Sequence, residues 1–265
     1  MKSCVLIRGG GDLATGVAVR LYRAGIRILI TELPQPLAVR RAVSLSEAVY
    51  ESEWKVEEVA ARRAETFEQA LALAAAGTVP VLVDPELVQV AGRTFHAIVD
   101  ARLTKRPPEG GMPAALLLIG LGPGFTAGQD CHAVVETRRG PTVGRVYWSG
   151  AAQADTSMPE GDPQRVLRSP IEGVITARTE IGQHVETGQL VATVGGAAVI
   201  SPFPGVVRGL IRPGLAVPAG LKIGDVDPRN TRELCFQVSD KALAVGGGVL
   251  EVLLSRADLR NRLWN

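Results

Sequence analysis

Three consecutive glycines, Gly9–Gly11, stand where a short apolar run gives way to a helical pattern. Each glycine costs conformational entropy on folding, so the run indicates that something approaches the backbone closely. The stretch from Gly9 to Ala14 fits G-x-G-x-x-(G/A), in which a pyrophosphate rests on bare amides at a helix N-terminus. Glu32 follows Gly11 by 21 residues, the place of a ribose-binding acid. The alternative is a glycine turn that serves tight packing alone, with Glu32 solvated.

Three residues of the expected first helical turn, Asp12, Leu13 and Thr15, complete this candidate nucleotide site. Asp12 has two interpretations, because a helix N-cap and a ligand contact suit it equally, and a cap would compete with a phosphate for the same amides. Arg40 and Arg41 follow Glu32, and their guanidinium groups suit phosphate or carboxylate oxygens. Their alternative is a solvated helix face.

A second glycine loop, "IGLGPGFTAGQD", follows the apolar run "ALLLI". Gly122, Gly124 and Thr126 offer a second backbone nest for an anion, although a structural turn explains them equally well. "DARLTKR" also follows an expected strand. It brings Asp100 to the same carboxyl edge, where open α/β sheets bind ligands.

Several motifs of catalysis are absent from the sequence. There is no GxxxxGK[ST], HExxH or GxSxG, and the three histidines are scattered. We therefore expect no metal site and identify no catalytic residue. Cys4, Cys131 and Cys235 form no CxxC pair, which speaks against a zinc clip or a disulfide framework. These three cysteines therefore give little support to a function in direct selenium or sulfur transfer.

Composition narrows the class of protein. The 265 residues are 46% hydrophobic with a net charge of +2, and aromatic residues make up 4%. The sequence has neither clustered basic charge nor the aromatic residues of a base-stacking platform, so we expect no nucleic-acid partner. No apolar run reaches the ~18 residues of a membrane helix, and the N-terminal apolar stretch is too short for a signal peptide. We expect a cytoplasmic protein with no membrane partner.

Alternating apolar runs and helical patterns predict an α/β fold. Strands are expected at 4–7, 26–31, 79–83, 96–101, 115–119, 132–136 and 143–148. Helical periodicity follows Leu13 and covers 66–76. Such alternation predicts a mostly parallel sheet, and we assign 1–155 to a Rossmann-like nucleotide-binding domain. The turn-rich stretch near residue 151 is expected to be a linker.

An internal repeat follows the expected linker. The 26 residues from Ser169 match those from Ser201 at eight positions, including Gly173/Gly205 and Gly182/Gly214. The pattern resembles lipoyl and biotinyl carrier domains, so we expect a small two-fold β domain (a barrel-sandwich hybrid) at 165–235. Its expected hairpin at 195–201 has no lysine, so we expect neither biotin nor lipoate.

The C-terminal segment, 236–265, has helical patterns at both ends. Gly246–Gly248 interrupts them, and each glycine inside a helix costs about 1 kcal/mol. We expect a turn or a tight crossing there, with the C-terminal helix packed back on the fold.

Long strings of this sequence resemble the YqeB family. They include "IRGGGDLATGVAVRLYRAG", "IGLGPGFTAGQDCHAVVETRRG" and "SDKALAVGGGVLE", and the match runs from about residue 4 to about 254. The resemblance implies an accessory role in the selenium-dependent molybdenum hydroxylase system. Relatives commonly read "RGH" where this chain has "RGPTVGRV" at 139–146, which weakens any mechanism built on that histidine.

Three functions remain open from the sequence. The first is an accessory protein that binds a nucleotide or molybdopterin cytosine dinucleotide, whose pyrophosphate and ribose would suit Gly9–Gly11 and Glu32. The second is an NAD(P)-dependent oxidoreductase, for which no acid or base can be named. The third is a non-enzymatic assembly scaffold. The expected protein partners are a molybdenum hydroxylase or its maturation factors, with self-association as a further candidate.

Overall fold

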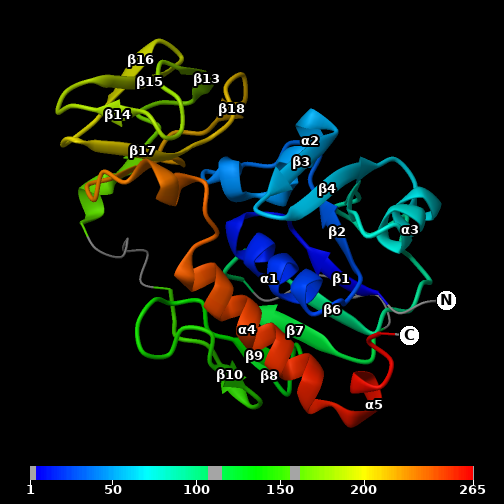
Figure 1. Cartoon of the computed structure of the whole chain (residues 1–265). Helices are drawn as coiled ribbons and strands as arrows, with labels where there is room; N and C mark the ends of the chain where they lie inside the picture. The colour runs from blue at the N-terminus through cyan, green and yellow to red at the C-terminus, as the bar shows by residue number, and fades with distance from the viewer. Residues whose placement is uncertain (1–3, 107–114, 156–161, 265) are drawn as a thin grey trace. The chain divides into compact units, whose positions relative to one another are not determined.

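The structure, a computed structural model, describes residues 4–106, 115–155 and 162–264. Two compact units make up the chain, shown with their elements in Figure 1. Unit 1 comprises Met1–Pro36, Leu45–Thr156 and Val238–Asn265, and unit 2 comprises Leu37–Ser44 and Ser157–Gln237. The excursion at Leu37–Ser44 therefore groups with the β-rich unit, which the sequence did not indicate. Residues 156–161, within the expected linker, lie outside the described residues.

Unit 1 is built on a nine-stranded sheet in the order β10-β9-β7-β6-β1-β2-β5-β4-β3. The strands are β1 Val5–Arg8, β2 Ile28–Glu32, β3 Glu53–Val56, β4 Val59–Ala64, β5 Val79–Val83, β6 Ala97–Asp100, β7 Leu118–Leu121, β9 Ala133–Val135 and β10 Val146–Tyr147. Neighbours from β4 to β9 pair in parallel, and β3 and β10 are antiparallel edges. A short pair, β8 Thr126–Ala127 and β11 Gly150–Ala151, lies apart from this sheet. The expected mixed α/β fold with a large, mostly parallel sheet is confirmed.

Burial on both faces explains the apolar runs of the central strands. Every residue of β1 and β2 is buried, as in sheets covered on both sides. Leu6 and Leu29 pack in one core cluster with Phe67 of α3 (Phe67–Ala75). Thr66 caps α3, since its Oγ1 accepts the Gln69 amide at 3.2 Å.

Helices α1 (Asp12–Arg23) and α4 (Asp240–Ser255) lie side by side in Figure 1. Their backbones nearly touch, because a Cβ on Gly16 would lie 2.3 Å from the Ala242 carbonyl oxygen, and one on Gly246 would lie 2.5 Å from that of Gly16. Likewise, a Cβ on Gly248 would lie 2.3 Å from the Gly144 carbonyl oxygen. Gly246–Gly248 thus forms the expected tight crossing inside a continuous helix, and no turn interrupts α4.

The remaining helical elements are short. They are η1 Arg41–Val43, η2 Leu45–Glu47, α2 Ala48–Glu51, η3 Pro163–Arg165, η4 Arg232–Cys235 and α5 Ala257–Arg260. Among the described residues, no helix has the length and hydropathy needed to cross a membrane.

Unit 2 consists of two four-stranded sheets, in the orders β12-β19-β17-β14 and β16-β15-β13-β18. The strands are β12 Val166–Arg168, β13 Gly173–Ala177, β14 His184–Val185, β15 Leu190–Val194, β16 Ala197–Ile200, β17 Gly205–Leu210, β18 Ala216–Val217 and β19 Lys222–Asp227. The first residues of β17, β18 and β19 stand 32 positions after those of β13, β14 and β15. The two copies of the repeat therefore fold into equivalent strands.

The two copies also exchange hydrogen bonds reciprocally. The Gly182 amide donates to the Val207 carbonyl oxygen, and the equivalent Gly214 amide donates to that of Ile175, both at 2.8 Å. Because β14 pairs with β17 and β18 pairs with β13, each sheet contains strands from both copies. Neither copy can complete its sheet alone, so the repeat is one folding unit.

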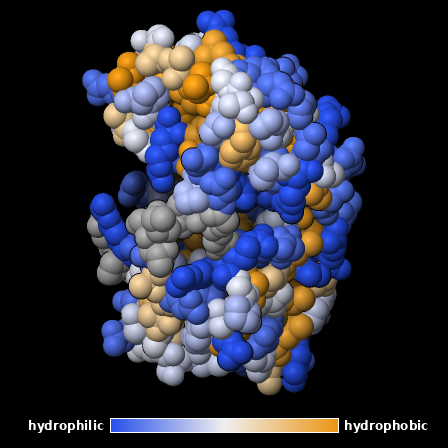
Figure 2. Space-filling view, turned by 90° about the vertical axis from the view of Figure 1, so that its left-hand side faces the viewer, coloured by the Kyte–Doolittle hydropathy of each residue, from blue (hydrophilic) through white to orange (hydrophobic). Residues whose placement is uncertain are grey.

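Apolar side chains gather near the top of the view in Figure 2. The exposed ones of unit 2 include Val174 on β13, Leu190 on β15 and Ile200 on β16. Leu190 and Ile200 are cross-strand partners, so the apolar surface is continuous across β15 and β16.

Candidate functional site

The order of strands in unit 1 reverses next to β1. From β1 the chain continues into β2 on one side, and it later returns to place β6 on the other side. Open α/β sheets bind ligands at such a switch point, outside the carboxyl ends of the strands. Here β1, β2 and β6 end in Arg8, Glu32 and Asp100, which are all buried. The sheet thus brings three charged side chains to one edge.

The three glycines after β1 have different surroundings. Gly9 has a φ of +92°, and a Cβ there would lie 3.3 Å from the Ala101 carbonyl oxygen. A Cβ on Gly10 would lie 3.0 Å from the Ser46 amide nitrogen. A Cβ on Gly11 would meet nothing within 4 Å. At Gly9 and Gly10 the close approach comes from the chain itself, whereas Gly11 leaves open space above the start of α1.

The 45–47 segment is hydrogen-bonded across the glycine turn. The Ser46 amide donates to the Gly10 carbonyl oxygen, and the Leu45 amide donates to Thr15 Oγ1, each at 2.9 Å. Thr15 Oγ1 in turn donates to the Gly11 carbonyl oxygen at 2.9 Å. The Thr15 side chain is fully buried, and its bond with the Leu45 amide ties α1 to this segment.

Asp12 and Leu13 begin α1, and Gly11 is the N-cap residue. The Leu13 amide donates to Asp12 Oδ1 at 3.0 Å, and the Leu13 side chain is buried. Asp12 is thus an acid of the first turn instead of the N-cap, and its carboxylate already uses one amide that a phosphate could contact.

Glu32 reaches back to the glycine turn. Its Oε1 accepts the Gly10 amide at 2.7 Å, and its Oε2 accepts the Leu33 amide at 2.5 Å. Burial raises the pKa of Glu32, and the two amides oppose that shift. Each carboxylate oxygen retains a second lone pair, so acceptance of a ribose hydroxyl stays a prediction.

A buried carboxylate at the end of β6 joins two arginines. Arg102 forms a fork on Asp100, with Nη2 to Oδ2 at 2.7 Å and Nε to Oδ1 at 3.0 Å. Arg8 Nη1 lies 3.6 Å from Asp100 Oδ2. Burial lowers the pKa of Arg8, the Arg102 charge acts in the same direction, and Asp100 opposes both. Arg8 and Arg102 escaped the sequence analysis, although a charged residue that ends an apolar strand is the signal for Arg8.

The second glycine loop is packed by its own chain. A Cβ on Gly122 would overlap the Thr137 side chain, and one on Gly124 would lie 2.7 Å from the Arg106 backbone. The amides of Gly122 and Thr126 donate to the Val135 carbonyl oxygen and to Asp130 Oδ2. These two amides therefore already have acceptors, and the anion nest stays a prediction.

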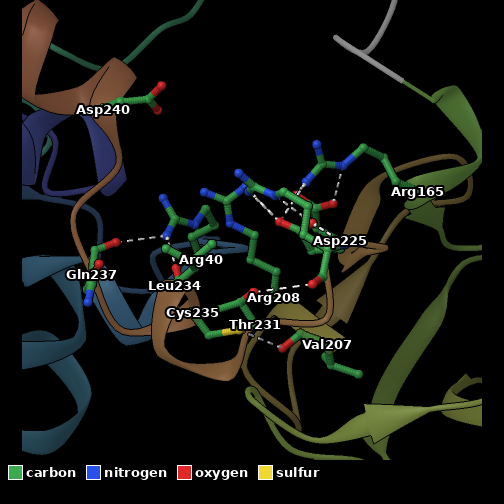
Figure 3. A network of polar contacts seen from close by, with 12 residues as sticks. Arg40, Arg165, Val207, Arg208, Asp225, Thr231, Leu234, Cys235, Gln237 and Asp240 are labelled. Atoms are coloured by element: carbon green, nitrogen blue, oxygen red, sulfur yellow. Dashed lines mark hydrogen bonds and ion pairs between the residues drawn. The ribbon is translucent and has the colours of Figure 1, made fainter. Parts of the chain in front are cut away.

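Arg40 and Arg41 belong to unit 2, whereas Glu32 belongs to unit 1. Arg40 Nη2 donates to the carbonyl oxygens of Leu234 and Gln237 at 3.3 and 3.1 Å, as Figure 3 shows. Arg41 Nε donates to that of Leu210 at 3.1 Å. Both guanidinium groups therefore hold the 37–44 segment within unit 2.

Comparison with known proteins identifies the family. No family model matches the chain. A curated protein of Escherichia coli K12, described as uncharacterized protein YqeB, is 43% identical over 254 residues, which is 94% of this chain. The chain belongs to the YqeB family. It spans about half the length of this curated relative, 47%.

Solved structures add little for this YqeB-family chain. An aspartoacylase family protein of Mesorhizobium loti shares 13% identity with a TM-score of 0.27, covering 85% of each chain. A succinylglutamate desuccinylase of Silicibacter shares 11% identity at the same TM-score, covering 85% of this chain and 84% of the other. Scores this low support no conclusion about fold or chemistry.

The cysteines of the YqeB-family chain are held as thiols. Burial raises the pKa of Cys4 to about 12, that of Cys131 to about 11, and that of Cys235 above its ordinary value. A thiol with a raised pKa is a weak nucleophile at neutral pH. Among the described residues, no group of three histidines, cysteines or acids could hold a metal ion.

Unit 2 should lose stability in acid because of Asp227. Burial raises the pKa of this carboxyl, but hydrogen bonds from Arg229 outweigh burial and lower it from 3.8 to about 2. The carboxylate thus contributes about 2 kcal/mol to the free energy of unfolding above pH 4, and this is lost as the pH falls to 2. Urea unfolding of the full chain from pH 5 to 2 measures the slope. Asp227→Asn should flatten it, and an unchanged slope would contradict the assignment.

Proposed function

We propose that this YqeB-family chain is an accessory protein for the maturation of selenium-dependent molybdenum hydroxylases. We further propose that unit 1 is Rossmann-like and binds a nucleotide or a nucleotide-bearing cofactor at the carboxyl edge of its large sheet. The observation that carries the binding proposal is the open backbone at Gly11, at the start of a 12-residue helix and beside the strand-order switch. The hydroxylase role rests on the family resemblance.

Two groups at this edge suit an anionic ligand, although the carboxylates of Glu32 and Asp100 lie there too. The N-terminus of α1 carries a positive partial charge and has no side-chain cap. Arg102 keeps 31% of its side chain exposed while it pairs with Asp100, so its guanidinium can also face a phosphate. Its Cα lies 3.4 Å from the position of a Cβ on Gly9, which brings Arg102 to the glycine turn.

Molybdopterin cytosine dinucleotide is the ligand we favour. Its pyrophosphate suits the amides at Gly11, and its ribose suits Glu32, whose carboxylate borders the same turn. NAD(P) shares both groups and is the alternative ligand.

A non-enzymatic scaffold is the second candidate function, because one specific observation favours it. Gly9 and Gly10 both have neighbours in the chain itself that explain the missing side chain. In that case the glycine run is a packing device, and the chain acts by binding a hydroxylase or its maturation factors.

For unit 2 we propose a lipoyl/biotinyl-like fold that serves as a docking module. The reciprocal strands of the repeat support this fold. The turn between β15 and β16 is Gly195-Gly196, so the place of a carrier lysine is filled by glycine. The exposed Val174, Leu190 and Ile200 support a protein contact.

Thermal melting against a ligand panel tests the binding proposal. The panel contains NAD, NADP, FAD, CTP, CDP and molybdopterin cytosine dinucleotide. A ligand at 100 times its Kd adds about 2.7 kcal/mol and raises Tm visibly. A flat panel together with co-purification of a hydroxylase would favour the scaffold.

Gly11→Ala is expected to weaken the binding of any ligand hit at least tenfold while the fold is retained. The added methyl meets nothing in the protein, and it would stand where a phosphate approaches the amides of α1. Titration calorimetry of the full chain measures the Kd. Gly247→Ala, at another open glycine without a positive φ, is the matched control and should bind normally. Unchanged affinity in Gly11→Ala would move the ligand away from this turn.

A further inference from the structure

Unit 2 contains a cluster of four arginines that the proposed function does not use. The arginine cluster consists of Arg40, Arg165, Arg208 and Arg229. Arg165 and Arg208 expose 21% and 12% of their side chains, whereas Arg229 exposes 58% and reaches solvent. Figure 3 shows the guanidinium groups of Arg40, Arg208 and Arg165 in one row, with Arg165 reaching in from the end opposite Arg40.

A β-bulge aims Arg208 into this cluster. On β17, Val207 pairs with Val226 and Gly209 pairs with Asp225, so Arg208 is the extra residue between two ladder positions. Bulges re-aim one side chain, and they are frequent beside functional sites. Here the bulge sends Arg208 toward Asp227, with Nη1 3.2 Å from Oδ2.

The same bulge brings Arg40 to the cluster. A Cβ on Gly209 would lie 2.8 Å from the Val39 carbonyl oxygen, so glycine is required for the 37–44 segment to approach β17. Arg40, the next residue, lies close enough to Arg208 for the two charges to repel. Burial lowers the pKa of Arg208, and the Arg40 charge lowers it further.

Two carboxylates on β19 are shared among several cations. Asp227 Oδ2 lies 2.6 Å from Arg229, 3.2 Å from Arg208 and 3.8 Å from Arg165. Asp225 pairs with Arg165 at 2.9 Å and with Lys222 at 3.7 Å. Arg208 Nε is buried and makes no hydrogen bond with any residue that the structure describes. A buried donor of this kind costs free energy unless an acceptor reaches it.

We propose that the arginine cluster binds the phosphate group of a small phosphorylated molecule, with Arg208 as its central contact. A guanidinium donates two parallel hydrogen bonds to a tetrahedral oxyanion, and several arginines together match its geometry and charge. The Arg208 fork supplies buried donors at the bulge, Arg165 and Arg40 border it, and Arg229 supplies the contact from solvent. The site lies within unit 2 and is independent of the Gly11 turn in unit 1.

Calorimetric titration of the full chain with inorganic phosphate, at constant ionic strength with chloride as the reference, tests the proposal. AMP serves as the phosphomonoester probe. Arg208→Lys keeps a charge for Asp227 but lacks the fork, so its affinity should fall at least tenfold. Arg229→Gln changes a side chain that is 58% exposed and should weaken binding several-fold; because it also removes a donor to Asp227, circular dichroism first checks that the variant is folded. Arg168→Ala is the matched control in the same sheet, because Arg168 donates to the Gly220 carbonyl oxygen instead of an aspartate.

The two probes separate the sources of the phosphate group. Tighter binding of AMP than of inorganic phosphate would indicate a phosphomonoester, and equal binding would indicate free phosphate. Gly11→Ala should leave both affinities unchanged, which distinguishes this site from the proposed nucleotide site. Absence of binding to wild type would overturn the proposal. Wild-type affinity in both Arg229→Gln and a folded Arg208→Lys would also overturn it. The cluster would then be an ion-pair network.

Discussion

Gly16→Ala should destabilise unit 1 by about 3 kcal/mol and lower its Tm by roughly 10 °C. The added Cβ would lie 2.3 Å from the carbonyl oxygen and 2.4 Å from the carbonyl carbon of Ala242. These are backbone atoms of α4, so no rotamer change can relieve the overlap, and the two helices must move apart. Thermal melting and urea unfolding of the full chain measure the effect.

The three glycines of α4 provide an internal control for this crossing. Gly246→Ala and Gly248→Ala should destabilise, because their Cβ atoms would lie 2.5 Å and 2.3 Å from the carbonyl oxygens of Gly16 and Gly144. Gly247→Ala should stabilise by about 0.5–1 kcal/mol, since its Cβ meets nothing within 4 Å and alanine favours the helix. Equal effects at all three positions would contradict the close contacts of Gly246 with α1 and of Gly248 with Gly144.

Asp100→Ala should destabilise unit 1 by about 3–5 kcal/mol. Asp100 is 1% exposed and pairs with Arg102 and Arg8. Arg102 can turn toward water, but the Arg8 side chain is 8% exposed and would keep a buried charge without this carboxylate. Urea unfolding at neutral pH measures the loss.

The double variant Arg8→Met with Asp100→Ala separates charge from packing. It should recover part of the lost stability, because it removes the buried charge together with its partner. Glu53→Ala is the control for a surface pair. The Nε of its partner Arg62 lies 3.1 Å from Glu53 Oε1, and the Arg62 side chain is 53% exposed. Loss of this pair should lower the free energy of unfolding by less than about 1 kcal/mol. A double variant less stable than Asp100→Ala would show that Arg8 stabilises the fold by other contacts.

The sequence predicted most of the sheet of unit 1. Apolar runs placed β1, β2, β5, β6, β7 and β9 within a few residues, and helical spacing placed α1 and α3. It missed the hairpin β3–β4, in which β3 is the edge strand and Glu53 and Arg62 are exposed. Edge strands bury one face only, and alanines and charges weaken their period-two pattern.

The candidate site was predicted in part. The pattern at Gly9–Gly11 and the acid at Glu32 meet in the fold, through the bond from the Gly10 amide to Glu32 Oε1. Arg40 and Arg41 belong to unit 2, and their place beside the glycine turn stays a prediction. The role of Arg102 was missed, because a residue beyond a strand end has no periodic signal of its own.

By itself the sequence determined the alternation of strands and helices, the family and the internal repeat, since each is written in local periodicity or in identical residues. The tertiary structure decided what each glycine serves. Gly16 and Gly246 are needed because helices 230 residues apart in the chain meet backbone to backbone, and Gly11 alone of its run faces open space. It also decided that Arg208, an ordinary residue in the sequence, stands at a bulge and reaches the buried Asp227. Contacts between distant segments determine these roles, and no local pattern encodes them.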